Sequence, residues 1–190
     1  MKIIKKIENF NKIRNISKMN YHNDGTRTLF ESVIYPEIIL ALKDWKENSI
    51  KNCVLIGGLA LSHYVKPRTT IDIDMLFSKD EDIPNRVLNF KRNRIHAFEH
   101  NKTQVEVELL TPDFIKIPLN VIQSIFSTSI TSDGIRIASP SGLVSSKLFR
   151  FNRQDQADIE QLIKYCDIDL LSFNLSQIEI DKFDSIKNNM

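Results

Sequence analysis

The sequence is short of the residues that cross-link a chain or break its regular structure. It has two cysteines, five glycines and six prolines in 190 residues. Two cysteines cannot make a disulfide framework or a cysteine-rich zinc site, and the low glycine and proline content excludes a collagenous or low-complexity chain. No apolar run approaches the ~20 residues that cross a bilayer. We therefore expect a cytoplasmic protein with reduced thiols and no membrane association.

What is present is an ordinary globular composition, with 42% hydrophobic and 26% charged residues. This length favours one domain. The net charge of +2 is unevenly distributed, because basic residues outnumber acidic ones up to Arg153 and acidic residues outnumber basic ones after it. A basic body suits a polyanionic ligand, although solvated charged surfaces explain such an imbalance more often.

Capping, turn and periodicity signals predict an alternation of helices and strands, which is typical of the α+β class. Asp133-Gly134 is the strongest turn signal and predicts a hairpin between the last two strands. The predicted helices cover 29–35, 36–45, 59–64, 84–94, 139–152, 155–166 and 175–186. The predicted strands cover 52–56, 70–77, 95–99, 104–110, 127–131 and 135–138.

Two glycines, Gly57 and Gly58, stand between a short apolar strand and a helix. Glycines at such a turn let the backbone approach a ligand closely and leave the first helical N–H groups free for phosphate oxygens. Taken alone, the turn is weak evidence for phosphate binding.

Asp72 and Asp74 lie two residues apart in a predicted strand, so their side chains project from the same face. Two adjacent carboxylates repel each other and need a cation to stay ionised. Mg²⁺ meets that need because it prefers carboxylate oxygens together with substrate phosphates. The alternative is a solvent-facing edge strand with alternating charges.

Taken together, these motifs resemble the signature of the DNA polymerase β-like nucleotidyltransferase superfamily, and in detail are similar to AbiEii/MenT-type toxin nucleotidyltransferases. The resemblance spans about residues 53–164. It implies an α+β nucleotidyltransferase fold, in which a small mixed or antiparallel sheet is flanked by helices, with a helical C-terminal part. The residues that carry it are Gly57, Gly58, Arg68, Thr70, Asp72 and Asp74.

On this resemblance the chain divides into three parts of one compact unit. Residues 1–50 are an N-terminal arm and helices that pack on the core. Residues 51–140 form the nucleotidyltransferase core, and residues 141–190 form the helical C-terminal region. The arm is basic and amphipathic over Met1–Lys18.

The resemblance also implies a third carboxylate on a neighbouring strand. Glu108 is the candidate, in the context Val-Glu-Leu-Leu-Thr, and Glu106 on the same face competes with it. This chain departs from the superfamily in having Glu instead of Asp there. It also has Gly58 where a serine is frequent, and Ser62 one turn later offers a substitute hydroxyl.

The implied reaction is transfer of a nucleotidyl group from an NTP to an acceptor hydroxyl. Asp72, Asp74 and Glu108 would hold Mg²⁺ or Mn²⁺, with Glu108 also helping to deprotonate the acceptor, and Lys147 would neutralise phosphate charge. Asp158 would orient Lys147 or Arg153, or pair with one of them at the surface. The implied nucleotide-binding residues are Gly57, Gly58, Ser62, Arg68, Thr70, Lys147, Arg153 and Asp158.

The acceptor is less specified. Four basic residues, Arg86, Lys91, Arg92 and Arg94, form a patch that suits an RNA or tRNA end, and the toxin-like resemblance points the same way. A solvated helix and hairpin explains the patch equally well, and a protein or small-molecule acceptor stays open. The implied partners are NTP, RNA and a cognate antitoxin or regulatory protein, in a toxin–antitoxin or phage-defence system. The alternative is a catalytically weak or inactive binding protein of this fold.

Overall fold

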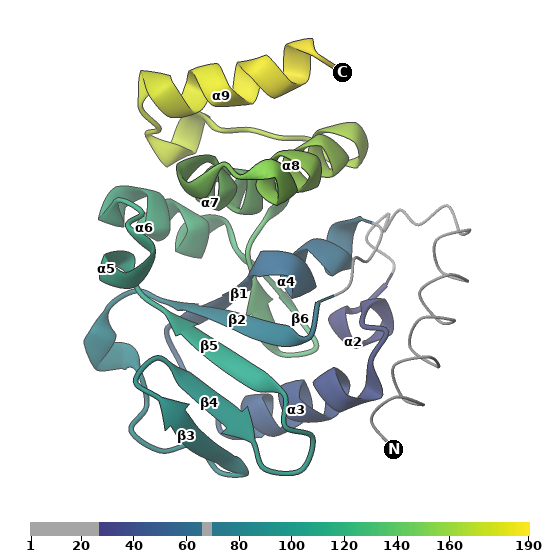
Figure 1. The fold of residues 1–190 in the computed structure, drawn as a ribbon, viewed down its shortest axis with the longest axis vertical. Helices are drawn as coiled ribbons and strands as arrows, with labels where there is room; N and C mark the ends of the chain where they lie inside the picture. Colours follow the sequence, from purple (N-terminus) through teal and green to yellow (C-terminus); the bar gives the residue numbers. More distant parts are fainter. Residues whose placement is uncertain (1–26, 66–69) are drawn as a thin grey trace.

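The computed structural model describes residues 27–65 and 70–190 (Figure 1). The N-terminal arm and Arg68 lie outside the described residues. The helices are α2 (Leu29–Ser32), α3 (Pro36–Glu47), α4 (Gly57–Tyr64), α5 (Pro112–Ile115), α6 (Leu119–Thr128), α7 (Pro140–Arg150), α8 (Arg153–Tyr165) and α9 (Gln177–Asn188), with short 3₁₀ turns η1 (Asp80–Asp82) and η2 (Leu171–Phe173).

Seven strands form one mixed sheet in the order β3-β4-β5-β2-β1-β7-β6. The β1–β7 and β2–β5 pairs are parallel and the other pairs are antiparallel. The α+β class and the mixed sheet with flanking helices are therefore confirmed. The strands are β1 (Cys53–Ile56), β2 (Asp72–Phe77), β3 (Phe90–Arg94), β4 (Ala97–His100), β5 (Glu106–Leu110), β6 (Ile130–Ser132) and β7 (Ile135–Ile137).

Helix α3 covers one face of the sheet (Figure 1). Its Trp45 packs edge-on against Phe90 of β3 and Phe98 of β4, with ring centroids 5.6 and 6.4 Å apart. Ile73 and Val107 are fully buried, whereas Asp72 and Glu106 beside them are only partly buried. Since side chains alternate along a strand, the polar residues of β2 and β5 occupy the face away from α3.

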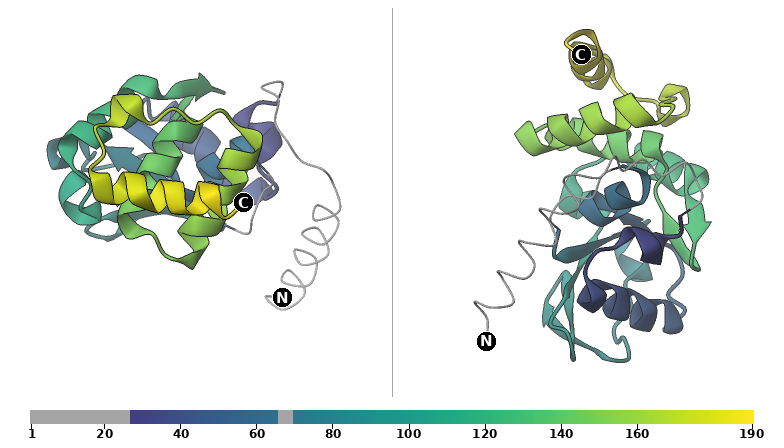
Figure 2. Two further views of the ribbon diagram at one scale, coloured as in Figure 1. Left: turned by 90° about the horizontal axis from the view of Figure 1, so that it is seen from above. Right: turned by 90° about the vertical axis from the view of Figure 1, so that its right-hand side faces the viewer.

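Helix α4 packs on β1 and β2, and α7 packs on α4. Helices α7, α8 and α9 are stacked at one end of the sheet (Figures 1 and 2). This arrangement brings the C-terminal end of α7 to the end of the sheet where α4 packs on β1 and β2 (Figure 1). Among residues 27–65 and 70–190, no helix has the length and apolarity needed to span a bilayer.

Most predicted elements are present, and the capping box of Thr28 and Glu31 is confirmed. Asp133 and Gly134 adopt positive φ angles of 52° and 78° at the β6–β7 turn, which confirms the predicted hairpin. These angles suit the tight turns that match the twist of paired strands.

Two predictions were wrong. The helix expected over 84–94 is a loop followed by strand β3, because Asn89 has a positive φ of 70° and Phe90 turns into the core under Trp45. The strand expected over 127–131 begins only at Ile130, because α6 runs to Thr128. Helix α6 itself was missed, although Val121, Ile122 and Ile125 bury one helical stripe.

Candidate active site

Four carboxylates lie on one face of strands β2 and β5. The parallel register pairs Asp72 with Glu106 and Asp74 with Glu108. Paired strands lie ~4.8 Å apart, so these side chains form a compact acidic row on the open face of the sheet. Ile73 and Val107 between them point into the core. The structure thus brings together Asp72, Asp74 and both candidates for the third carboxylate.

Mutual repulsion within this row is visible at Glu108. Its pKa is raised, first because burial disfavours the charged form and then because Asp72 and Glu106 repel it. Arg94 offsets this rise, with its guanidinium 3.9 Å from the Glu108 carboxylate and a closer ion pair to Glu106. Arg94 therefore neutralises part of the row from the end of β3, the edge strand on the far side of β4.

Gly57 gives Asp74 the space that it occupies. The register places Ile56 of β1 opposite Asp74, so the first residue of α4 faces the carboxylate. A Cβ at position 57 would lie 1.8 Å from Asp74 Oδ2, and Gly57 has a φ of +71°. Only glycine adopts this conformation readily and allows so close an approach. The predicted Gly-Gly turn and the Asp-x-Asp strand therefore form one unit.

The N-terminus of α4 opens beside this carboxylate. Ile56 is its N-cap residue and has no polar side-chain atom to satisfy the first helical N–H groups. The positive end of a helix attracts anions, and phosphate is the usual ligand of such an end. An anion at this point would lie between α4 and the carboxylate row.

Two predicted nucleotide-binding hydroxyls have intramolecular partners. The Thr70 hydroxyl donates to Asp72 Oδ1 over 2.8 Å, which orients that carboxylate. The buried Ser62 hydroxyl donates over 2.9 Å to the Gly58 carbonyl inside α4. Thr70 therefore supports the acidic row, whereas Ser62 is engaged within its own helix.

Lys147 lies in a buried ion-pair network between α7 and α8. Its amino group is 2.6 Å from Asp158 Oδ2 and 3.3 Å from Asp155 Oδ1. Lys147 is only 5% exposed and Asp158 3%, so the Lys147–Asp158 pair that was expected is present but buried. Arg153 stands exposed at the start of α8.

Burial opposes ionisation of Asp155, but hydrogen bonds from Arg150 and the charges of Lys147 and Arg150 outweigh it and hold its pKa below the ordinary value. The stability that Asp155 contributes is present above its unfolded-state pKa and is lost as the pH falls through the lower folded-state pKa.

Arg150 is a site residue that the sequence reasoning missed. Its guanidinium makes two 2.7 Å hydrogen bonds to Asp155, yet 68% of the side chain is exposed. These bonds raise its pKa, burial opposes the rise, and the charge of Asp74 adds to it. Arg150 is thus an exposed cation that Asp155 holds in place and whose pKa responds to the charge of Asp74. Its position three residues after Lys147 on one helix face was the available signal.

The predicted basic patch is largely compensated within the chain. Lys91 pairs with Glu99 at 2.8 Å, and Arg94 pairs with Glu106. Arg92 donates to the carbonyls of Pro84 and Ile95 and lies over the Phe98 ring. Arg86 is exposed in the loop before β3. The patch exists at the sheet edge, but its charges are not all directed at solvent.

The row suits a hard cation chemically, because its donors are carboxylate oxygens and because the carboxylates repel one another without one. Mg²⁺ is commonly held by one or two carboxylates plus substrate phosphates. Within residues 27–65 and 70–190, however, no three His, Cys, Asp or Glu side chains are gathered closely enough to hold a metal ion on their own. The pair Asp72 and Asp74 therefore fits the ion with a phosphate ligand, and the third ligand stays a prediction.

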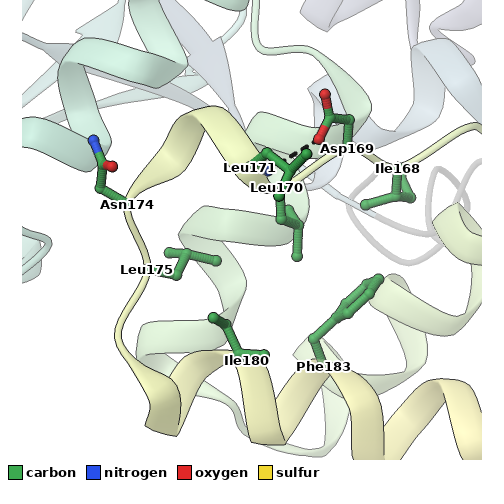
Figure 3. A pocket seen from close by; sticks show the side chains of 8 residues that line it. All are labelled: Ile168, Asp169, Leu170, Leu171, Asn174, Leu175, Ile180 and Phe183. Carbon is green, nitrogen blue, oxygen red and sulfur yellow. Dashed lines mark hydrogen bonds between the residues drawn. The ribbon is translucent and has the colours of Figure 1, made fainter.

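Other sites in the described chain carry less chemistry. Burial raises the pKa of both Cys53 and Cys166 to about 11, so neither offers a thiolate at neutral pH. A cavity of about 400 Å³ lies between η2 and α9, where Leu170, Leu175, Ile180 and Phe183 point into it (Figure 3). It is apolar and lies within the C-terminal helices.

A strand–glycine turn–helix unit beside a strand with paired carboxylates, in a mixed sheet flanked by helices, defines the nucleotidyltransferase fold. The chain belongs to the family described as "Nucleotidyltransferase of unknown function (DUF6036)", whose model matches residues 37–188. A comparison with curated proteins gave no match. The nucleotidyltransferase class expected from the sequence is confirmed, and the likeness to AbiEii/MenT-type toxins stays a prediction.

The close approach of Gly57 and Asp74 gives the first prediction. Gly57→Ala should lose ~1–3 kcal/mol of unfolding free energy from strain at positive φ and should also displace the Asp74 carboxylate. Gly134→Ala is a matched control, because Gly134 has φ +78° and its Cβ would meet only the flexible Lys46 side chain. Thermal unfolding should show similar losses for both, and Mg²⁺–NTP binding should fall only in Gly57→Ala. Equal NTP binding by the two variants would contradict the role of this contact.

The two cations of α7 give the second prediction. Lys147→Met should destabilise the fold by ~3–5 kcal/mol, because it removes the buried cation that Asp155 and Asp158 share. Arg150→Gln should cost less stability, since Arg150 is largely exposed, but should weaken NTP binding. Urea unfolding and NTP titration separate the two effects. A stable Lys147→Met variant that has lost NTP binding would restore Lys147 as a phosphate ligand.

Proposed function

We propose that this protein transfers a nucleotidyl group from an NTP to an acceptor hydroxyl, using a divalent cation held by Asp72 and Asp74. The observation that carries the proposal is the contact between Asp74 and Gly57, which joins the acidic row to the N-terminus of α4. A cation site and a phosphate site side by side are what a metal–triphosphate complex requires.

Each residue has a distinct part in this arrangement. The backbone N–H groups at Gly57 and Gly58 would bind triphosphate oxygens, and Arg150 would contribute charge from the opposite side. Thr70 orients the Asp72 carboxylate. Mg²⁺ or Mn²⁺, when bound, supplies charge stabilisation on the phosphoryl oxygens. The sequence motif alone assigns Arg68 to phosphate binding.

The reaction is an in-line substitution at the α-phosphorus. The acceptor oxygen forms a bond to the α-phosphorus while the bond from the α-phosphorus to the bridging oxygen breaks. Pyrophosphate leaves with the electron pair of that bond, and the hydroxyl proton passes to water. Glu108 lies on β5 beside Asp74, β5 flanks β2 on the side opposite to β1, and the acceptor would enter from this β5 side.

For the acceptor we propose an RNA end, with a role as a toxin of a toxin–antitoxin or phage-defence system. The AbiEii/MenT-type motif and the basic edge strand β3 support this choice. The compensated charges of Lys91 and Arg94 weaken a purely electrostatic account, so contacts other than phosphate pairing must contribute.

A second candidate is a nucleotide-binding regulatory protein without transfer activity, such as an antitoxin-like partner. Arg94 favours it, because this cation already occupies the position beside Glu106 and Glu108 that a second metal ion would take. The two candidates differ in one outcome: the regulatory protein binds Mg²⁺–NTP and transfers no label.

The proposal is tested by incubating the protein with α-labelled NTPs, Mg²⁺ and total cellular RNA and protein, then separating the products. The wild type should label RNA. Asp72→Asn and Asp74→Asn should each reduce labelling by at least ~10³-fold without loss of thermal stability, because each removes a cation ligand and relieves repulsion. Labelling that survives either substitution would refute the role of Asp72 and Asp74 in binding the cation. Label found in protein instead of RNA would identify a protein as the acceptor.

Glu106 and Glu108 are separated by a matched pair of substitutions. Glu108→Gln should abolish labelling, whereas Glu106→Gln should reduce it mildly, because Glu106 is already paired with Arg94 and Asn93. The reverse order would move the third carboxylate to Glu106. Small and equal effects of the two substitutions on labelling would favour the nucleotide-binding regulatory protein.

A further inference from the structure

A cavity of about 440 Å³ lies directly beside the acidic row and shares Glu108 and Arg94 with it. It is lined by Arg94, Ile95, His96, Glu108 and Phe114, from the β3–β4 turn, strand β5 and helix α5. Its volume lies within the ~300–1,000 Å³ typical of small-ligand sites. Because Glu108 is in its wall, a ligand in this cavity would touch the row.

Two aromatic rings form one wall of the cavity. The imidazole of His96 and the ring of Phe114 are 4.9 Å apart at an interplanar angle of 30°, close to a parallel stack. Phe114 is 53% exposed and Ile95 is 78% exposed, so large apolar surfaces meet solvent here. Adjacent exposed apolar side chains at the mouth of a cavity indicate a binding surface.

Polar groups stand at fixed places around this apolar wall. The buried Nδ1 of His96 has no hydrogen-bond partner among residues 27–65 and 70–190. Buried polar atoms are normally satisfied, so this nitrogen, on a residue that lines the cavity, could accept a hydrogen bond from a ligand or donate one to it once the ring turns toward the cavity. The His96 carbonyl accepts a 2.9 Å hydrogen bond from the Leu109 amide, which anchors the turn to β5. Arg94 adds a cation at the rim.

A planar heterocycle with hydrogen-bonding edges, attached to an anionic group, matches these features. Its ring would stack on the exposed Phe114 ring beside His96, as nucleobases stack on aromatic side chains in proteins that bind single-stranded RNA. Its edge would meet the imidazole nitrogen, and its phosphate would meet Arg94. A nucleotide has all three parts.

The order of the strands indicates whether the cavity would bind the NTP or the acceptor nucleotide. Strand β1, which leads into Gly57, lies on one side of β2, and β5 and β4 lie on the other side. In an in-line reaction the incoming oxygen approaches the α-phosphorus opposite the leaving pyrophosphate. A triphosphate bound at Gly57 would leave the β5 side, where Glu108 lines the cavity, free for the acceptor. We propose that the cavity binds the terminal nucleobase of a ribonucleotide acceptor and places its ribose hydroxyl next to Glu108. This inference depends on the proposed function for the direction of the reaction.

The test uses 2-aminopurine ribonucleoside 5′-monophosphate as the probe, because its fluorescence is quenched on stacking. The probe is titrated into the full-length protein without metal or NTP. Phe114→Ala should weaken binding by at least about tenfold, and Phe114→Tyr should restore it, because base–aromatic stacking supplies the affinity. Leu119→Ala is the control, since Leu119 is also 53% exposed and lies outside the cavity wall. It should leave probe binding unchanged.

Saturating Mg²⁺–NTP should not displace the probe, and Asp74→Asn should leave probe binding intact. Displacement by NTP would mean that the cavity holds the base of the NTP and would overturn the inference. Equal probe binding by the wild type and a folded Phe114→Ala variant would also overturn it, as would preference for a tyrosine peptide over the nucleotide. Because these titrations need no transfer, Phe114-dependent binding without label transfer would uphold the cavity and refute the proposed reaction.

Discussion

The candidate site depends on the contact between the Asp74 carboxylate and the backbone of Gly57. Strand β2 can carry its acidic residues against the start of α4 only because position 57 has no side chain. In the proposed function, that contact sets the distance between the carboxylates that would hold the cation and the backbone N–H groups that would bind the triphosphate. Thr70, Arg150 and the neighbouring strand β5 are then arranged around it.

The charges around this contact come from the sheet, which carries the carboxylates and Arg94, and from helix α7, which carries Arg150. The acidic row on the sheet repels itself, and Arg94 and Arg150 reach toward it from β3 and α7. Lys147 has a different role, because two buried carboxylates of α8 enclose it. Lys147 and Arg150, one turn apart on α7, therefore both bind carboxylates of α8, but only Arg150 is largely exposed.

The sequence predicted the Gly-Gly turn, the strand with Asp72 and Asp74 and the shared face of Glu106 and Glu108, because these follow from alternation along strands and from glycine geometry. It could not predict the partners of Lys147 or Arg94, because ion pairs between distant elements depend on packing. Helix 84–94 was wrong for a related reason, since Phe90 is drawn into the core by Trp45 on α3. The cavity beside Glu108 could not be predicted from the sequence either, because His96 and Phe114 come together only in the folded protein.

We propose that Asp72, Asp74 and the start of α4 form one cation–triphosphate site. The direct measurement is paramagnetic broadening of backbone amide NMR signals by Mn²⁺ with an NTP at low stoichiometry. Broadening should be strongest at Gly57, Gly58 and residues 72–74, and should vanish there in Asp74→Asn. Broadening centred instead on the acid-rich helices α8 and α9, or unchanged by that substitution, would contradict a cation–triphosphate site at the start of α4.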